Sequence, residues 1–299
     1  MKITILGSNG FLSNAIAKYA NKNNWTLEVY GLDEPIGVQY DKFVQCNLMD
    51  AELDCSGLLG ADIIVYAIGA GIQSNLKEGY NLIYSLNVTA PVTICNKLKE
   101  LDFKGVFVTF GSVFEMGETT EAHFFSEEEV MSSTAPAPSD YVVSKRMLTR
   151  FVTSYKHNFT HWHFIIPTIY GEAENPKRLI PYTINAIKNG EELHFTAGDQ
   201  TRQYVYVDEV PRLIELSFEN NLPSGMYNIQ GKETLTVKEI VTLIHKEMGK
   251  QLPEDCFGTA QRTDVGMKYL ALDGSLLNNC IGGIECTIEI KDVIKKYIL

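Results

Sequence analysis

Three side chains near the middle of the chain have the types and spacing of a proton-transfer site. Tyr141 and Lys145 are four residues apart, so a helix would place both on one face. A cation stabilises a phenolate, and we expect Lys145 to lower the pKa of Tyr141 from ~10 toward the range of a general acid–base. Ser112 ends an apolar run 29 residues before Tyr141 and adds a hydroxyl. Taken alone, a chance Tyr-x-x-x-Lys on a packed helix is the better interpretation.

A glycine-rich turn near the N-terminus is typical of a dinucleotide-binding loop. Gly7 and Gly10 follow a short apolar strand and precede a helix. Gly7 permits a tight turn, and Gly10 lets backbone N–H groups approach a pyrophosphate. Asp33 lies 26 residues after Gly7, where a carboxylate binds a ribose 2′-hydroxyl and repels a 2′-phosphate. The pattern favours NAD(H), with NADP(H) as the alternative cofactor. If the motif has no binding role, the glycines form a tight βα turn and Asp33 is an acid exposed to solvent.

Alternating strands and helices must position these residues. We expect strands at 3–6, 27–32, 63–67, 106–110 and 163–167, and helices at 14–22, 82–99 and 140–155. This alternation predicts an α/β fold with a Rossmann doubly wound parallel sheet. The carboxyl ends of its strands would place Gly7, Asp33, Ala67, Ser112 and Pro167 along one rim.

The last third of the chain has a less regular pattern. Helices are expected at 178–189, 237–248 and 288–299, and extended pieces at 193–196 and 203–207. We therefore divide the chain into an NAD(P)-binding domain, residues 1–170, and a smaller C-terminal lobe, residues 171–299. The chain is expected to return to the first domain near 203–232.

Composition limits the partners. The chain has 299 residues, 45% of them hydrophobic, which is enough for a large core. Its 26 basic and 37 acidic residues give a net charge of −11. Nucleic acid and anionic membranes both require a basic face, so neither is expected as a partner. The longest apolar stretch, 61–72, is shorter than the ~20 residues of a membrane helix.

The cysteines and histidines show no metal-binding spacing. The six cysteines contain no Cys-x-x-Cys pair, so we expect free thiols in the cytoplasm and no metal. His161 and His163 would share one face of a strand, but no cysteine or carboxylate accompanies them. A packed strand is therefore favoured over a metal site. The other histidines are scattered and suggest no partner: His123, His157, His194 and His245.

Together these motifs resemble the extended short-chain dehydrogenases/reductases, in the NAD-dependent epimerase/dehydratase family that acts on nucleotide sugars. The resemblance covers nearly the whole chain, although Ser13 replaces a third glycine and Asn47 replaces an adenine-contacting acid. It implies that Ser112, Tyr141 and Lys145 are catalytic. The cofactor contacts that it implies are Gly7, Asn9, Gly10, Phe11, Leu12, Asp33, Asn47, Leu48, Ala67, Ile68, Gly69, Asn87, Tyr141, Lys145 and Pro167.

The C-terminal lobe carries the more specific part of the resemblance. The segment 198–208 is similar to the family's Gly-x-Gln-x-Arg-Asp-Phe-Val-Tyr-Val-Asp, and 262–264 to its Arg-Pro-Gly-Asp. In relatives these two arginines hold the phosphates of the sugar nucleotide, a role that suits guanidinium groups. The resemblance implies a nucleotide-sugar substrate contacted by Ser112, Thr168, Arg178, Arg202 and Arg262. For either arginine alone, a surface salt bridge is the default.

Departures from the family pattern narrow the choice among the reactions that the family carries out. Dehydratases carry Thr-Asp-Glu where this chain has Gly111-Ser112-Val113, so the acid and base for eliminating water are missing. Thr168 replaces an asparagine of many epimerases. The segment after Ser112 is also unlike that of common 4-epimerases because of its acids Glu115, Glu118, Glu121, Glu127, Glu128 and Glu129.

The resemblance therefore implies an NAD(P)-dependent oxidoreductase that reduces C4 of an NDP-4-keto-6-deoxyhexose. An NDP-hexose 4-epimerase with tightly bound NAD would use the same residues and is the alternative. A non-catalytic, cofactor-sensing protein of the same fold is a remote one. Relatives pair the helices at 82–99 and 140–155 across a dimer, so we expect a homodimer; packing within one chain is the alternative.

Overall fold

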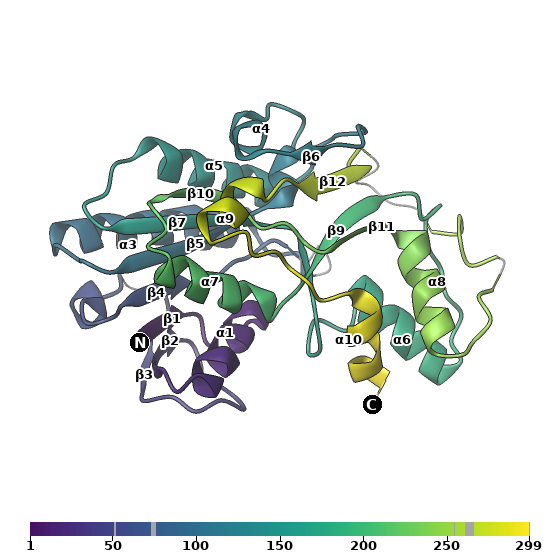
Figure 1. Cartoon of the computed structure of the whole chain (residues 1–299), viewed down its shortest axis with the longest axis horizontal. Helices are drawn as coiled ribbons and strands as arrows, with labels where there is room; N and C mark the ends of the chain where they lie inside the picture. Colours follow the sequence, from purple (N-terminus) through teal and green to yellow (C-terminus); the bar gives the residue numbers. More distant parts are fainter. Residues whose placement is uncertain (51, 73–75, 254, 261–265, 299) are drawn as a thin grey trace.

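Figure 1 shows a computed structural model of the chain, which describes residues 1–50, 52–72, 76–253, 255–260 and 266–298. Its larger sheet has seven strands in the order β10-β7-β5-β4-β1-β2-β3, and every neighbouring pair is parallel. This confirms the predicted doubly wound α/β sheet. The strands are β1 (Lys2–Leu6), β2 (Thr26–Gly31), β3 (Lys42–Gln45), β4 (Ile63–Tyr66), β5 (Val106–Ser112), β7 (Thr160–Ile166) and β10 (Gly225–Asn228).

Helices cover both faces of this sheet (Figure 1). They are α1 (Phe11–Lys22), α2 (Tyr80–Tyr84), α3 (Ala90–Glu100), α5 (Asp140–Ser154), α7 (Glu209–Glu219) and α9 (Ser275–Cys280). On one face, Ile16 of α1 and Leu213 of α7 join Ile5 in a buried cluster. On the other, Leu98 of α3 packs with Phe107. Side chains point alternately to the two faces along each strand. Because helices cover both faces of this sheet, both faces are apolar.

A smaller sheet lies beside the first, with the order β11-β9-β12-β6 and β8 paired to β9. Its strands are β6 (Phe124–Phe125), β8 (Thr168–Tyr170), β9 (Thr201–Tyr206), β11 (Glu233–Thr236) and β12 (Tyr269–Leu272). The remaining helices are α4 (Glu127–Ser132), α6 (Leu179–Asn189), α8 (Val237–Glu247) and α10 (Ile290–Ile298). Residues of α6, α8 and α10 share one buried cluster with Tyr204 and Tyr206 of β9.

The chain passes between the two sheets more than once. Of the segment 203–232, α7 packs on the larger sheet and β10 joins it, whereas β9 pairs with strands of the smaller sheet. Conversely, β6 comes from within the first 170 residues and pairs with β12. The division near residue 170 stays a prediction. Across the described residues, no helix has both the length and the apolarity that crossing a bilayer requires.

The helix expected at 82–99 is interrupted by a wider turn. A π-helical segment, Ser85–Thr89, lies between α2 and α3. Pro91 has no N–H, so it cannot make the α-helical bond to the carbonyl of Asn87. Short π-helical segments of this kind are frequent at functional sites.

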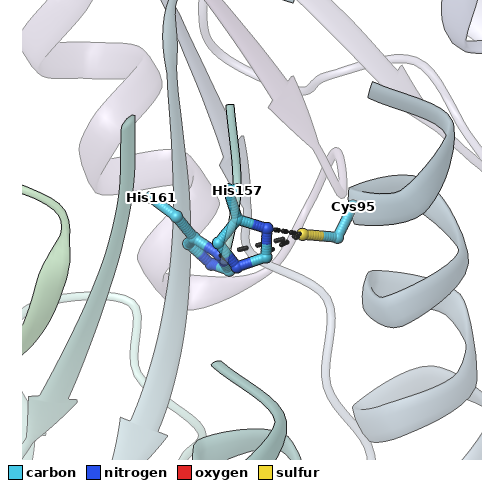
Figure 2. Close-up of side chains that lie close together, drawn as sticks. All are labelled: Cys95, His157 and His161. Carbon is cyan, nitrogen blue, oxygen red and sulfur yellow. Dashed lines mark hydrogen bonds between the residues drawn. The ribbon is translucent and has the colours of Figure 1, made fainter. Parts of the chain in front are cut away.

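Polar side chains are buried between β5, β7 and α3. Thr109 Oγ1 lies 2.9 Å from His161 Nε2 and 2.8 Å from His163 Nδ1, so the two histidines share one face of β7 as expected. Figure 2 shows that Cys95 of α3 points at His157 and His161; its Sγ lies 3.3 Å and 3.8 Å from their Nδ1 atoms. The expectation that no cysteine accompanies these histidines is therefore wrong. The fold brings Cys95 to them across more than sixty residues.

Candidate active site

The three predicted catalytic residues meet where β5 ends and α5 begins. Ser112 is the last residue of β5, and Tyr141 and Lys145 lie on the buried face of α5. The Ser112 side chain is hydrogen-bonded to Tyr141. Lys145 Nζ donates to the Phe110 carbonyl at 2.8 Å and lies 5.8 Å from the centre of the Tyr141 ring. A hydroxyl, a phenol and an ammonium group thus form one cluster at the rim of the sheet.

Burial controls the ionisation of this cluster. Desolvation raises the pKa of Tyr141 to about 12, although the Ser112 hydrogen bond and the positive charge of Arg178 oppose the rise. The expectation that Lys145 lowers this pKa is wrong for this arrangement. Desolvation lowers the pKa of Lys145 itself to about 8, and its ammonium binds the Phe110 carbonyl. Tyr141 is therefore protonated at neutral pH and suited to donate a proton.

Glu115, one of the acids of the segment after Ser112, is a buried carboxyl group. It lies in the short turn Val113–Met116, where its Oε1 accepts from the Ser112 N–H at 2.8 Å and its Oε2 from Thr149 Oγ1 at 2.6 Å. Desolvation raises its pKa to about 7. Glu115 thereby joins the end of β5 to α5. The Ser112-x-x-Glu115 spacing of a capping box is the signal that could have revealed it.

The turn between β1 and α1 fits a pyrophosphate. Gly7 has a φ of +111°, and a Cβ added there would lie 2.9 Å from Ile68 Cγ1. Gly10 precedes α1, and in the described part of the chain no side chain caps that helix, so its first N–H groups can bind an anion. Gly31 ends β2 against Ser8, and a side chain at Gly31 would clash with that residue. The turn is therefore tightly packed at Gly7 and Gly31, and it presents the first N–H groups of α1 at the rim.

Two predicted cofactor residues hold the loops around this turn. Asn9 Nδ2 donates to the Glu34 carbonyl at 3.0 Å, and its Oδ1 accepts from the Ile36 N–H at 3.0 Å. Asn87 is buried in the π-helical segment and binds both the N–H and the carbonyl of Ala70 at 2.9 Å. Both amides position the backbone that would face the cofactor.

The other predicted cofactor residues lie along the same rim. Asp33 is exposed just after β2, and Asn47 is exposed after β3, with its side chain bonded to Asp50. Leu48 borders a small cavity of about 170 Å³ beside α3. Leu12 packs into the core, so its side chain does not face the turn. The remaining ones follow β4, start α1 or follow β7: Ala67, Ile68, Gly69, Phe11 and Pro167.

A cleft of about 410 Å³ opens between this rim and the smaller sheet. Three of the five predicted substrate residues line it: Thr168, Arg178 and Arg202. Arg178 Nε pairs with Glu174 Oε2 at 3.0 Å, and its charge acts on Tyr141. Arg202 is buried, and its guanidinium donates to backbone carbonyls of both β9 and the segment before β12. Arg262 lies outside the described residues.

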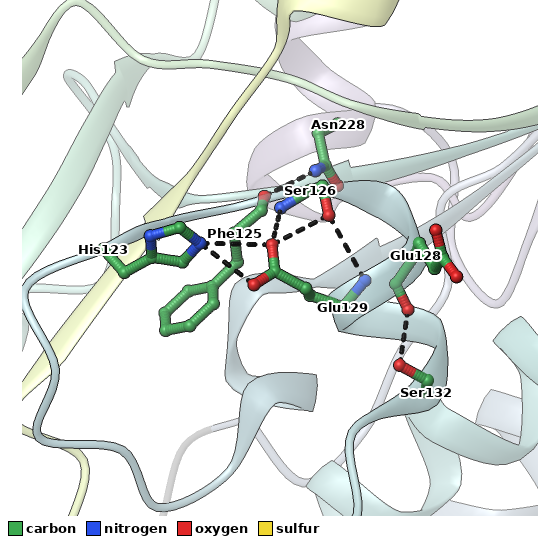
Figure 3. A network of polar contacts seen from close by, with 7 residues as sticks. All are labelled: His123, Phe125, Ser126, Glu128, Glu129, Ser132 and Asn228. Atoms are coloured by element: carbon green, nitrogen blue, oxygen red, sulfur yellow. Dashed lines mark hydrogen bonds and ion pairs between the residues drawn. The ribbon is translucent and has the colours of Figure 1, made fainter.

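Carboxylates tie the acidic segment after Ser112 to the fold, and Figure 3 shows the contacts of one of them, Glu129. Ser126 and Glu129 form a capping box at the start of α4, and His123 Nε2 lies 3.0 Å from Glu129 Oε1. Glu127 Oε1 accepts from the N–H of Asn228, whose side-chain amide donates to the backbone of β6. These acids therefore support β6 and β10.

The comparison with known families agrees with this geometry. The model of the NAD dependent epimerase/dehydratase family matches residues 3–229. The chain belongs to this family. The match includes the glycine turn, the cluster of Ser112, Tyr141 and Lys145, and all of β10.

The proteins that are similar to this chain carry the names of several different activities. CDP-abequose synthase of Salmonella muenchen is 24% identical over 249 residues, which are 81% of this chain and 78% of that protein. The structure of DesIV, a dTDP-glucose 4,6-dehydratase from Streptomyces venezuelae with NAD and TYD bound, aligns with a TM-score of 0.85 at 18% identity, covering 100% of this chain and 96% of the other. UDP-glucose 4-epimerase from Thermus thermophilus in complex with NAD has a TM-score of 0.80 at 17% identity, with coverage of 100% and 98%. The likeness to these structures confirms the fold.

Proposed function

We propose that this family member is an NAD(H)-dependent oxidoreductase that acts at C4 of a nucleotide-linked hexose and reduces an NDP-4-keto-6-deoxyhexose. The observation that carries the proposal is the cluster of Ser112, Tyr141 and Lys145 beside a cleft that contains Arg178 and Arg202. The relative whose name carries a CDP-linked sugar supports a nucleoside-diphosphate carrier.

The cluster can protonate a carbonyl oxygen as it is reduced. NADH bound along the rim supplies the hydride. Tyr141 donates its phenolic proton to the oxygen, so that an alcohol forms, and Ser112 hydrogen-bonds the same oxygen while its charge develops. Lys145, whose ammonium is fixed by the Phe110 carbonyl, is assigned to the ribose of the nicotinamide. A proton from solvent then restores Tyr141.

The arginines of the cleft would hold the substrate at a distance from the reacting carbon. Arg178 and Arg202, with Arg262 by resemblance, are assigned to the diphosphate, because guanidinium groups bind phosphate through paired donors. Thr168 is assigned to the sugar. Binding energy from the nucleotide then orients C4 at Tyr141.

The surroundings of Ser112 support reduction over dehydration. Elimination of water needs a second acid–base pair near the substrate, and Gly111 and Val113 offer none. The nearby carboxyl of Glu115 is fully buried and bonded to the Ser112 N–H and to Thr149. It therefore acts on the protein rather than on the sugar.

Turnover with a defined substrate tests this proposal. Protein would be mixed with NADH or NADPH and a dTDP- or CDP-4-keto-6-deoxyhexose, and the absorbance of the reduced cofactor followed. Consumption matched one-for-one by a new deoxyhexose supports the reductase. NAD that stays bound through purification, with interconversion of UDP-hexoses and no net NADH use, would assign the 4-epimerase instead. Absence of both reactions would leave a cofactor-binding protein and overturn the proposal.

Asp33 is proposed to select NAD(H) over NADP(H). Its exposed carboxylate at the end of β2 would repel a 2′-phosphate. We expect Asp33→Ala to raise kcat/KM for NADPH relative to NADH by roughly tenfold, the effect of removing one like-charge contact of ~1.4 kcal/mol. Glu34→Ala removes the neighbouring exposed acid and serves as the control. Steady-state kinetics with both cofactors decide, and an unchanged ratio in Asp33→Ala would refute this role.

We also propose a homodimer and a cytoplasmic location. Val143 and Met147 of α5 and Tyr80 of α2 are 36%, 47% and 64% exposed, an apolar surface on the two helices that relatives pair. Met147→Glu is expected to convert the dimer to a monomer, because it would bury a charge at the interface. Light scattering coupled to gel filtration measures the mass. A wild-type monomer would contradict the expectation.

The cytoplasmic location is supported by six free cysteines.

A further inference from the structure

Cys95, His157 and His161 form a second cluster of side chains, all of types that bind metals, and the proposed reaction does not use it. They come from α3, from the connection between α5 and β7, and from β7 (Figure 2). Cys95 and His161 are almost wholly buried, whereas His157 is half-buried and gives the cluster access to solvent. One ligand atom from each residue lies within 4.8 Å of the other two.

The distances among the three ligand atoms fit one tetrahedral metal ion. Cys95 Sγ lies 3.8 Å from His161 Nδ1 and 3.9 Å from His157 Nε2, and the two nitrogens are 3.2 Å apart. A tetrahedral zinc ion with Zn–S of ~2.3 Å and Zn–N of ~2.0 Å holds its ligand atoms ~3.3–3.6 Å apart. These distances are within a few tenths of an ångström of that range. Coordination also requires the half-buried His157 ring to turn, because its Nδ1 lies nearer to Cys95 Sγ, at 3.3 Å, than its Nε2 does.

Hydrogen bonds place the proton of His161 on its Nε2 and leave the lone pair on Nδ1, the nitrogen nearer to Cys95. Thr149 donates to Glu115, so it accepts from His163 Nε2 at 2.9 Å, and His163 Nδ1 is left as an acceptor. That nitrogen accepts from Thr109, whose oxygen in turn accepts from the Nε2–H of His161. Nδ1 of the neutral His161 ring is then unprotonated and faces Cys95. Metal-binding histidines are typically fixed by a hydrogen bond on the other ring nitrogen in this way.

We propose that Cys95, His157 and His161 bind one thiophilic transition-metal ion, with Zn²⁺ as the expected occupant. The donor set of one thiolate and two imidazoles suits Zn²⁺ and excludes Mg²⁺ and Ca²⁺, which prefer oxygen ligands. Three protein ligands leave the fourth position for water at the side of His157. The ion would join α3 to β7, so its binding would stabilise the folded chain.

Cobalt titration tests the site without reference to catalysis. Tag-free protein, first stripped of metal with a chelator, would be titrated with Co²⁺, which gives a thiolate-to-metal charge-transfer band when a cysteine coordinates it. We expect one Co²⁺ per chain, this band, the strong visible absorption of a tetrahedral ion, and displacement by Zn²⁺. A Co²⁺ spectrum without the charge-transfer band, or no binding, would overturn the proposal.

Matched variants identify the ligands. Cys95→Ser is expected to lose the charge-transfer band and to weaken binding at least ~100-fold, and His157→Gln to weaken it at least ~10-fold, whereas Cys280→Ser, at an exposed cysteine, stays like wild type. Zn²⁺ should raise the Tm of wild type and Cys280→Ser, but not of the other two. Equal affinity in His157→Gln and wild type would refute the site even if Cys95→Ser failed to fold.

Discussion

Tyr141→Phe should lower turnover by roughly 10²–10⁴-fold, the usual contribution of a positioned proton donor. The change removes the phenolic oxygen and keeps a buried ring of the same shape, so the fold and the cofactor turn should be unaffected. Because burial raises the pKa of Tyr141 to about 12, the wild-type phenol holds its proton throughout the neutral range. The variant has no phenol, so a change of pH in that range cannot rescue it. Single-turnover reduction under saturating NADH measures the loss.

Tyr155→Phe is the matched control for this experiment. Tyr155 caps the far end of α5, is 37% exposed, and contacts Lys99 rather than the cleft. Its loss should leave kcat and KM unchanged. NADH binding should be equal in wild type and both variants. If Tyr141→Phe turned over at the wild-type rate, the proposed proton donor would be wrong.

Replacing Glu115 should change how stability depends on pH. Its pKa is raised from 4.5 to about 7 in the folded chain, so between these values the unfolded carboxyl loses its proton while the folded one retains it. Stability from this group is therefore greatest below pH 4.5, falls as pH rises to 7, and is constant above. The loss is ~3 kcal/mol at ~1.4 kcal/mol per pKa unit. Glu115→Gln stays neutral and should lack this dependence.

Urea unfolding at pH 5 and pH 8 tests the effect. The free energy of unfolding of Glu115→Gln, relative to wild type, should increase by up to ~3 kcal/mol from pH 5 to pH 8. Glu121→Gln, at an exposed acid of the same segment, should show no such change. Glu115→Ala should in addition cost ~3 kcal/mol at both pH values, because it leaves the Ser112 N–H without its acceptor and opens a cavity. A constant difference between Glu115→Gln and wild type would mean that this carboxyl does not titrate as stated.

Much of the larger sheet could be predicted because its signals are local. Apolar runs and helical spacing locate β1, β4, β5, α1 and α5 within a few residues. Such signals fail for β3, a half-buried edge strand of four residues, and for β6, which has only two. The π-helical segment Ser85–Thr89 was missed because it is a single wider turn within an apolar pattern that otherwise has helical spacing.

The sequence indicates which residues belong to the candidate site, but not which contacts hold them in place. The spacing of Tyr141 and Lys145 indicates their common helix face, yet the position of the lysine ammonium depends on the Phe110 carbonyl, which only the fold brings near. Likewise, Glu115 and Thr149 are 34 residues apart, and Cys95 and His157 are 62 apart. A pattern of residue types carries no information about which distant polar groups will pair inside a core. Arg262 shows the other limit, since its assignment rests on resemblance alone.

The exchange of strands between the two sheets limits how segments of this chain can be replaced by segments of a relative. β6, from the first half of the chain, completes the smaller sheet, and β10, from the second half, completes the larger one. A single cut near residue 170 would leave each fragment with an unpaired strand edge and exposed apolar surface. A chimaera that takes a new sugar specificity from a relative must therefore transplant several separate segments together, including the one that carries β6. Shuffling by one crossover is expected to give insoluble protein, whereas a graft that respects both strand exchanges can fold.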